Sequence, residues 1–224
     1  MAANNISSKR AGKIVDYKQL NALSSVVLYD TGKKKKNASF YEVERVITRR
    51  RVCHGYEYLI KSKGWSLETS TWEPSENLSP DLLRNYEEPP ITNERLQVAS
   101  SQFACGVTSA LRSRRSAPVY ITIDLDVWRY VVFEKGVPSE HRGHHLFKME
   151  DFRKFKYLPE NWWYNLNGDG NGISVDFPLK AKPILSWSPK KYTKKDGKMV
   201  EAKRFPVEKV CLTIIRKSCV AEQI

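Results

Sequence analysis

Two runs of basic residues suggest contact with phosphate groups. They are Lys33, Lys34, Lys35 and Lys36 in one run and Arg49, Arg50 and Arg51 in the other. The chain has 38 Lys and Arg against 25 Asp and Glu, a net charge of +13. Such an excess attracts nucleic acid, because binding releases the counterions condensed on the phosphates. DNA or RNA is therefore a candidate partner through these basic segments, while a solvated tether for the lysines and a solvated hairpin tip for the arginines remain the alternatives.

Five short blocks between residues 41 and 78 form a second pattern. They read Tyr-Glu-Val-Glu-Arg-Val at 41–46, Glu-Tyr-Leu-Ile-Lys at 57–61, Lys-Gly-Trp at 63–65, Thr-Trp-Glu-Pro at 71–74 and Glu-Asn-Leu at 76–78. Their order and spacing resemble those of a chromodomain of the heterochromatin-protein type, a small reader of methylated lysine on histone tails. The resemblance covers about residues 39–88, and the C-terminal half resembles no family that we recognise.

The resemblance implies an aromatic cage for a methylated ammonium group. Aromatic faces hold such a cation by cation–π attraction and by burial of its methyl groups. The family uses three aromatic residues, and the matching positions here are Tyr41, Ser62 and Trp65. Ser62 offers no aromatic face, so one wall is missing. Three alternatives follow. The cage binds methyl-lysine weakly with two walls, or Phe40 or an aromatic residue of the second domain supplies the third wall. In the third alternative the domain no longer binds methyl-lysine and is a nucleic-acid- or protein-binding module derived from a mobile element.

The resemblance also implies that a peptide binds as an added β-strand. Main-chain hydrogen bonds hold such a peptide, and pockets read its alternate side chains. The segments that would clasp it are residues 40–43 and 73–79. The implied contact residues are Phe40, Glu42, Val43, Glu73 and Asn77. The expected partner is a methylated histone H3 tail.

Local patterns predict the elements that position these residues. Residues 41–51, 56–61 and 71–73 are rich in β-forming residues and read as strands. A helix is expected to begin after Ser79, a good N-cap residue, and to end before Pro89. Three strands and one helix also make up the chromodomain fold, so the local patterns agree with the resemblance.

Composition and alternation divide the rest of the chain. Residues 1–38 read as a basic flexible tail, 89–117 as a linker rich in Ser and Arg, 118–218 as a separate β-rich domain of unknown family and 219–224 as a short tail. Apolar residues alternate over 119–127 and predict a half-buried strand, and β character continues over 130–133. Asp196 and Gly197 suit a hairpin turn. The predicted fold class is α+β to mainly β, with a sandwich or barrel as the base expectation for the second domain.

No pattern favours catalysis, a cofactor or a metal. Asp124 and Asp126 would share one face of a strand, and solvent-facing alternation explains them. His141, His144 and His145 lack the spaced ligands of a zinc site, and the loop at 165–176 departs from a calcium-binding loop. The sequence has no P-loop, nucleophile elbow or dinucleotide-binding motif. The chain is therefore expected to be no enzyme, with no catalytic residue, cofactor or metal.

The remaining composition indicates the compartment. The four cysteines are scattered and suit free thiols in a reducing environment. No apolar run reaches the length of a membrane span, and the first residues lack the apolar region of a signal peptide. With the chromodomain resemblance, these features predict a nuclear chromatin adaptor that binds heterochromatin. No membrane is expected among its partners. Its C-terminal domain would bind an unknown protein partner.

Overall fold

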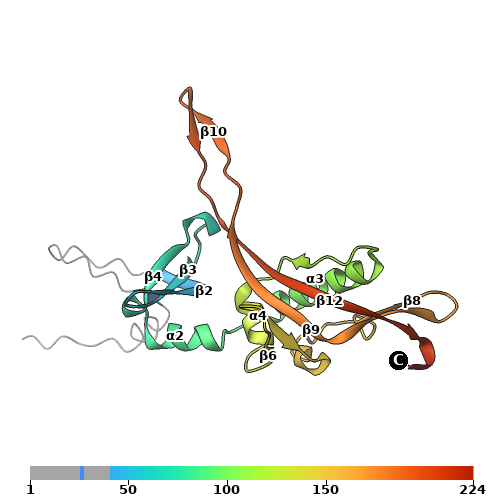
Figure 1. The fold of residues 1–224 in the computed structure, drawn as a ribbon. Helices are drawn as coiled ribbons and strands as arrows, with labels where there is room; N and C mark the ends of the chain where they lie inside the picture. The colour runs from blue at the N-terminus through green and yellow to red at the C-terminus, as the bar shows by residue number, and fades with distance from the viewer. Residues whose placement is uncertain (1–25, 28–40, 224) are drawn as a thin grey trace, which may run out of the picture.

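The computed structural model of the chain describes residues 26–27 and 41–223. These residues form two units that lie side by side (Figure 1). The first unit is a small sheet with one α-helix, and the second is a larger sheet with two α-helices and a projecting hairpin. The predicted tail at 1–38 lies outside the described residues except for Val26 and Val27, which form a short strand.

The first unit is an antiparallel sheet followed by a helix. Its elements are β1 (Val26–Val27), β2 (Tyr41–Val52), β3 (Gly55–Ser62), β4 (Thr71–Pro74) and α2 (Pro80–Glu87), with 3-10 turns at Leu67–Thr69 and Ser75–Asn77. The sheet order is β1-β2-β3-β4. Ser79 caps α2, since its hydroxyl accepts a hydrogen bond from the Leu82 N–H at 3.3 Å. The three predicted strands and the helix that follows them are confirmed.

The core of the first unit lies between the sheet and α2. Its buried residues are Val43, Val46, Tyr58, Ile60, Leu78, Leu82 and Tyr86. The rings of Tyr58 and Tyr86 meet edge to face, with centroids 5.2 Å apart. This contact fixes the helix on the sheet, because such aromatic pairs prefer a defined geometry.

The second unit is built on one long hairpin. Its elements are α3 (Asn93–Arg112), β5 (Val119–Ile121), α4 (Leu125–Val131), β6 (Val137–Pro138), β7 (His145–Phe147), β8 (Tyr164–Leu166), β9 (Asn171–Trp187), β10 (Tyr192–Lys195), β11 (Lys198–Glu201) and β12 (Pro206–Val220). The sheet order is β5-β12-β9-β7-β6, and β8 also pairs with β9. Strands β9 and β12 pair along most of their length, and the hairpin β10–β11 projects beyond them (Figure 1). The predicted β-rich second region is confirmed.

Several predictions about this region are wrong. Residues 89–117 were expected to be a linker but contain the 20-residue helix α3. Apolar residues recur there at helical spacing (Leu96, Ala99, Phe103, Val107 and Leu111), and all of them are buried in the second core. Small and polar residues lie between them, so the composition of the segment is typical of a linker. The second unit therefore begins near residue 91 rather than residue 118.

The predicted strand over 119–127 is shorter than expected, and the β character predicted over 130–133 is wrong, because helix α4 extends to Val131. Strand β5 ends at Ile121, and helix α4 begins at Leu125, with Val127, Trp128 and Val131 buried. Alternation and helical spacing coincide over so few residues, so the pattern alone does not separate them. The result is a single sheet with α3 and α4 packed into one shared core, rather than a sandwich or barrel.

Candidate functional site

The cage positions gather at one end of the first sheet. Tyr41 opens β2, where its backbone pairs with Val27 of β1; its side chain lies outside the described residues. Ser62 ends β3, opposite Val43 of β2. The Trp65 N–H donates to the Ser62 carbonyl at 3.3 Å, so these two residues are neighbours across one turn. The turn needs glycine at position 64, where φ is +76°.

Trp65 is the most open of the described cage positions. Its side chain is 54% exposed, unlike the aromatic residues of the two cores. Ser62 beside it is half-buried and carries only a hydroxyl. A cation that approached this corner would meet one broad indole face and one small polar side chain. The arrangement is therefore suited to partial enclosure of a methylated ammonium group.

The implied peptide-contact residues have different environments. Glu73 is buried, and its carboxylate accepts hydrogen bonds from the Thr71 hydroxyl at 2.7 Å and from the Asn77 amide at 3.3 Å. Glu73 and Asn77 thus brace the segment that follows β4. Val43 is a core residue, and Glu42 is exposed and bonded to Lys63 at 2.8 Å. Phe40 lies outside the described residues.

The edge of β2 that a peptide would join already has neighbours. Strand β1 pairs antiparallel with it, with Val26 opposite Glu42 and Val27 opposite Tyr41. Farther along, the carbonyls of Val46 and Ile47 accept hydrogen bonds from Arg129 of the second unit at 2.9 and 3.2 Å. The outer edge of β2 is therefore covered by the chain itself at two places.

Of the two basic runs predicted to contact phosphate, the structure describes only the arginines. Lys33, Lys34, Lys35 and Lys36 lie outside the described residues. Arg49 bonds to Glu87 at 2.6 Å, and Arg50 bonds to Glu57 at 2.7 Å and lies 4.2 Å from the centroid of the Trp72 ring. Arg51 is exposed and makes no ion pair within the described residues. Two of the three arginines are thus engaged within the first unit.

A buried ion-pair network joins the two units. Arg45 of β2 bonds to Glu208 of β12 at 2.6 and 3.0 Å and to Asp126 of α4 at 3.1 Å. Arg95 of α3 bonds to Asp126 at 2.7 Å and to Asp124 at 2.6 Å. The expectation that both aspartates face solvent is wrong for Asp126, which is 1% exposed. Alternation could not reveal this, because the arginine partners lie about 30 to 80 residues away.

The network favours the ionised form of Asp126. Burial by itself raises the pKa of Asp126, but the hydrogen bond from Arg95 and the charges of Arg45, Arg95 and Arg129 bring it below its ordinary value. Burial likewise disfavours the charged form of Arg45, yet Glu208 and the two aspartates raise its pKa overall. Because each carboxylate is bonded to a guanidinium, none is free to act as a general base.

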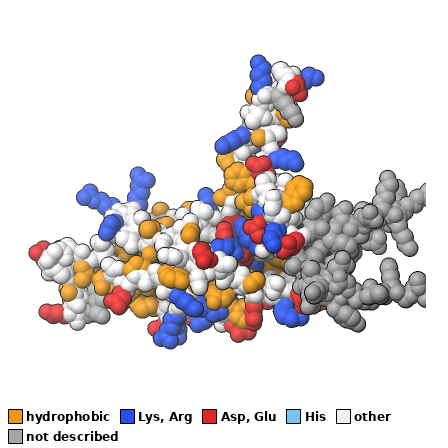
Figure 2. All heavy atoms as spheres, turned by 180° about the vertical axis from the view of Figure 1, so that it is seen from behind, with side chains coloured by type: hydrophobic (Ala, Val, Ile, Leu, Met, Phe, Trp, Pro, Cys, Tyr) orange, Lys and Arg blue, Asp and Glu red, His pale blue; other side chains and the backbone are white. Residues whose placement is uncertain are grey.

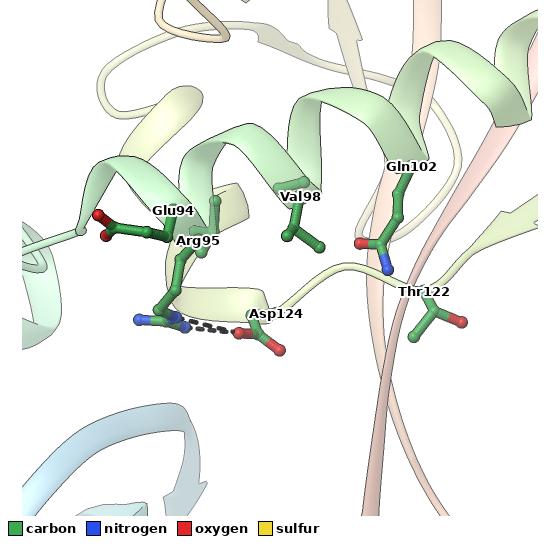
Figure 3. A pocket seen from close by; sticks show the side chains of 8 residues that line it. Glu94, Arg95, Val98, Gln102, Thr122 and Asp124 are labelled. Atoms are coloured by element: carbon green, nitrogen blue, oxygen red, sulfur yellow. Dashed lines mark hydrogen bonds and ion pairs between the residues drawn. The ribbon is translucent and has the colours of Figure 1, made fainter. Parts of the chain in front are cut away.

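A shallow pocket adjoins this network (Figure 3). It has a volume of about 240 Å³ and lies between α3 and the segment that leads into α4. Arg95 and Asp124 are bonded to each other at one end, while Val98, Gln102 and Thr122 line the rest. The charges of Arg95 and Asp124 neutralise each other, while Glu94 adds a second acid to the lining.

Arg129 makes the second link between the units. Besides the two carbonyls of β2, it donates to the Tyr86 carbonyl at 2.5 Å and lies 3.9 Å from the centroid of the Tyr86 ring. Burial lowers the pKa of Arg129, and nearby acids only partly offset this. One side chain of α4 thus binds both the edge of β2 and the end of α2.

The described residues lack two further features. No cluster of three or more His, Cys, Asp or Glu side chains in residues 41–223 is placed to hold a metal ion. None of the described helices combines the length and the apolar character needed to cross a bilayer.

Residues 41–89 match the family model of the Chromo (CHRromatin Organisation MOdifier) domain. Among curated proteins, the chain is 46% identical over 59 residues to histone-lysine N-methyltransferase SUV39H2 of Mus musculus, which is 25% of this chain and 12% of that protein. It is 39% identical over 71 residues to the probable chromo domain-containing protein LHP1 of Oryza sativa subsp. japonica, which is 30% of this chain and 17% of that protein. It is 52% identical over 44 residues to chromobox protein homolog 8 of Homo sapiens, 19% of this chain and 11% of that protein.

These matches identify the first unit. Residues 41–89 are a chromodomain, as the sequence blocks and the fold of strands and helix indicate. The chromodomain is a non-catalytic reader fold. The matched segments cover less than a fifth of each relative, so they carry over nothing of the relatives' other parts. No solved structure matches the chain, and the family model covers none of the second unit.

Proposed function

We propose that this chain is a non-enzymatic chromatin adaptor that reads a methylated lysine of a histone H3 tail. The observation that carries the proposal is the partly exposed Trp65 one turn from Ser62, at the corner of a chromodomain where Tyr41 also begins its strand. A nuclear location follows from this role. The methyltransferase among the relatives matches only through the chromodomain, so its named activity is not assigned to this chain.

The cage works with two aromatic walls rather than three. One cation–π contact contributes about 0.5–2 kcal/mol. The missing wall at Ser62 therefore weakens methyl-lysine binding by up to roughly thirtyfold at 1.4 kcal/mol per tenfold change. The protein is thus a weak reader whose affinity depends strongly on Trp65, because an indole gives the best cation–π face.

Strand β1 competes with the peptide for the edge of β2. A peptide that adds to residues 40–43 needs the backbone groups that β1 occupies opposite Tyr41 and Glu42. Binding then requires displacement of β1. Replacement of Val27 with Pro removes a backbone donor from β1 and should tighten peptide binding. An unchanged affinity would show that β1 does not compete with the peptide.

The test of the reader is a titration of trimethylated and unmodified H3 tail peptides at physiological salt. Wild-type protein should prefer the methylated peptide, and Trp65→Ala and Tyr41→Ala should lose most of that preference. Ser62→Trp should strengthen it by about twofold to thirtyfold, because it restores the third wall. Tyr120→Ala removes an equally exposed aromatic residue from the second unit and should change nothing. Equal binding of both peptides by wild type and by Ser62→Trp would refute the proposal.

A second function remains a candidate because of Ser62. A chromodomain without a complete cage can serve as a binding module for another protein or for nucleic acid. Salt separates the two functions, because nucleic-acid binding weakens steeply with added salt while a cage that binds one cation weakens much less. Tight, methyl-independent and strongly salt-dependent binding at the first unit would favour this second function.

A further inference from the structure

The hairpin that projects from the second unit is not used by the proposed reader. We call residues 188–205 the arm; it contains β10 and β11. Figure 1 shows it rising away from both units. Its strands stay in register, with Tyr192 opposite Glu201 and Lys195 opposite Lys198. Asp196 and Gly197 both have positive φ, of 49° and 78°, as the tight turn of a regular hairpin requires.

The side chains of the arm bury almost no surface against the rest of the protein. From residue 189 to residue 201 every described side chain is exposed, including Tyr192 at 57%, Met199 at 67% and Val200 at 46%. A two-stranded hairpin covered on neither face is only marginally stable in water. An ordered ribbon with two open faces therefore indicates a surface that a partner covers.

The charge of the arm indicates what that partner is. The arm holds seven Lys and Arg residues against two acids, Asp196 and Glu201. Lys190 lies 3.8 Å from Glu201, and Arg204 bonds to backbone carbonyls at the base. Lys191, Lys194, Lys198 and Lys203 make no ion pair within the described residues. Figure 2 shows Lys and Arg side chains at the tip and along the sides of the arm, with hydrophobic side chains at its base.

This pattern differs from the other basic hairpin of the chain. At the tip of β2 and β3, Arg49 and Arg50 are each bonded to an acid and lie against aromatic rings. A cation that is already paired with an acid gains less free energy from contact with phosphate, because its ion pair must first break. The lysines of the arm are solvated and concentrated, so their neutralisation by a polyanion releases counterions without breaking internal ion pairs.

We propose that the arm binds duplex DNA by entering its major groove. A two-stranded β-ribbon fits the major groove of B-form DNA, which is about 12 Å wide. The arm extends about 25 Å from Ser188 to Asp196 at about 3.3 Å per residue, which spans the groove and brings lysines to the phosphates on both sides. The major groove of A-form RNA is too narrow for such a ribbon. Lysine contacts to phosphate position the arm without reading sequence.

The test is fluorescence polarisation of the full chain with a labelled duplex DNA of about 20 base pairs, over a series of salt concentrations. The arm variant carries Lys191→Gln, Lys194→Gln, Lys198→Gln and Lys203→Gln. The control variant carries Arg114→Gln, Lys148→Gln, Arg153→Gln and Lys156→Gln, four exposed side chains of the second unit's body. Both variants lose the same net charge, and neither alters a buried residue, so each is expected to fold.

The proposal expects the arm variant to lose at least about tenfold in affinity and to reduce the slope of log K against log salt by about 3 to 4, since each lost phosphate contact removes about 0.9. The control variant should keep both quantities close to wild type. Equal losses in the two variants would overturn the proposal, since net charge alone would then explain binding. Equal or tighter binding of duplex RNA would overturn the major-groove assignment. Methylated-peptide binding should be unchanged in the arm variant, so a failure of the reader leaves this test intact.

Discussion

The two units differ in how much apolar core they bury. Within the described residues, the core of the chromodomain holds seven buried residues, whereas that of the second unit holds twenty. Small domains bury a smaller fraction of their surface and are correspondingly marginal. Two arginines, Arg45 and Arg129, tie the smaller unit to the larger one. We therefore expect the chromodomain to depend on its neighbour for stability and the second unit to be stabilised by its own core.

The largest expected effect comes from Arg45→Met. This change leaves Asp126 and Glu208 without their partner from the first unit, and breaking a buried ion pair on one side typically costs about 3–5 kcal/mol. Urea denaturation should show a loss of that size. Arg51→Met, which alters an exposed arginine of the same strand, should change the free energy of unfolding by less than about 0.5 kcal/mol. A loss below 1 kcal/mol for Arg45→Met would contradict the dependence of the first unit on the second.

Arg129→Met should have the next largest effect and should act on the first unit. It removes the donor that serves the carbonyls of Val46, Ile47 and Tyr86, and an unsatisfied buried polar group costs about 1–3 kcal/mol. Hydrogen exchange should speed up in β2 and α2 while the amides of β9 and β12 stay protected. Uniform acceleration across both units would instead show that they unfold together and that the second unit is not the more stable of the two.

A smaller and more local loss is expected within the second unit from Gly172→Ala. A Cβ atom at this position would lie 2.0 Å from the Asn165 carbonyl oxygen of the paired strand. The strands β8 and β9 must then separate, at a cost of about 1–3 kcal/mol. Gly168→Ala is the matched control, because nothing lies within 4 Å of its Cβ position. The large core should keep the unit folded, and its complete unfolding at room temperature would show that the core is not self-sufficient.

The smallest effect concerns pH. The pKa of Asp126 is lower in the folded protein than in the unfolded chain, so its contribution to stability is fully present above the unfolded value of about 3.9 and is lost as the pH falls through the folded value. The free energy of unfolding should therefore fall below about pH 4. Asp126→Asn should flatten that fall, and Asp169→Asn, an exposed control, should not. An equal acid response in both variants would exclude Asp126 as its source.

The chromodomain could be predicted from the sequence because its determinants are local. Ser79 caps a helix, Gly64 permits a turn, and alternating β-formers mark the strands. Each of these signals acts within a few residues of its effect. The Asp196-Gly197 turn was predicted for the same reason, and it is confirmed.

The second unit and the contact between the units could not be predicted in this way. Helix α3 has small and polar residues between its buried ones, so its composition is typical of a linker although its spacing is helical. Asp126 is buried only because Arg45 and Arg95 reach it from distant parts of the chain. Pairing over such separations leaves no pattern in a single sequence.

The most direct test of the reader is the indole N–H resonance of Trp65 in a two-dimensional NMR titration with H3 tail peptides. The account predicts that trimethylated peptide shifts this resonance together with the amides of Ser62 and Glu42, whereas unmodified peptide at the same concentration shifts them far less. Shifts of equal size with both peptides, or shifts confined to residues away from this corner of the sheet, would contradict methyl-lysine recognition by this chromodomain.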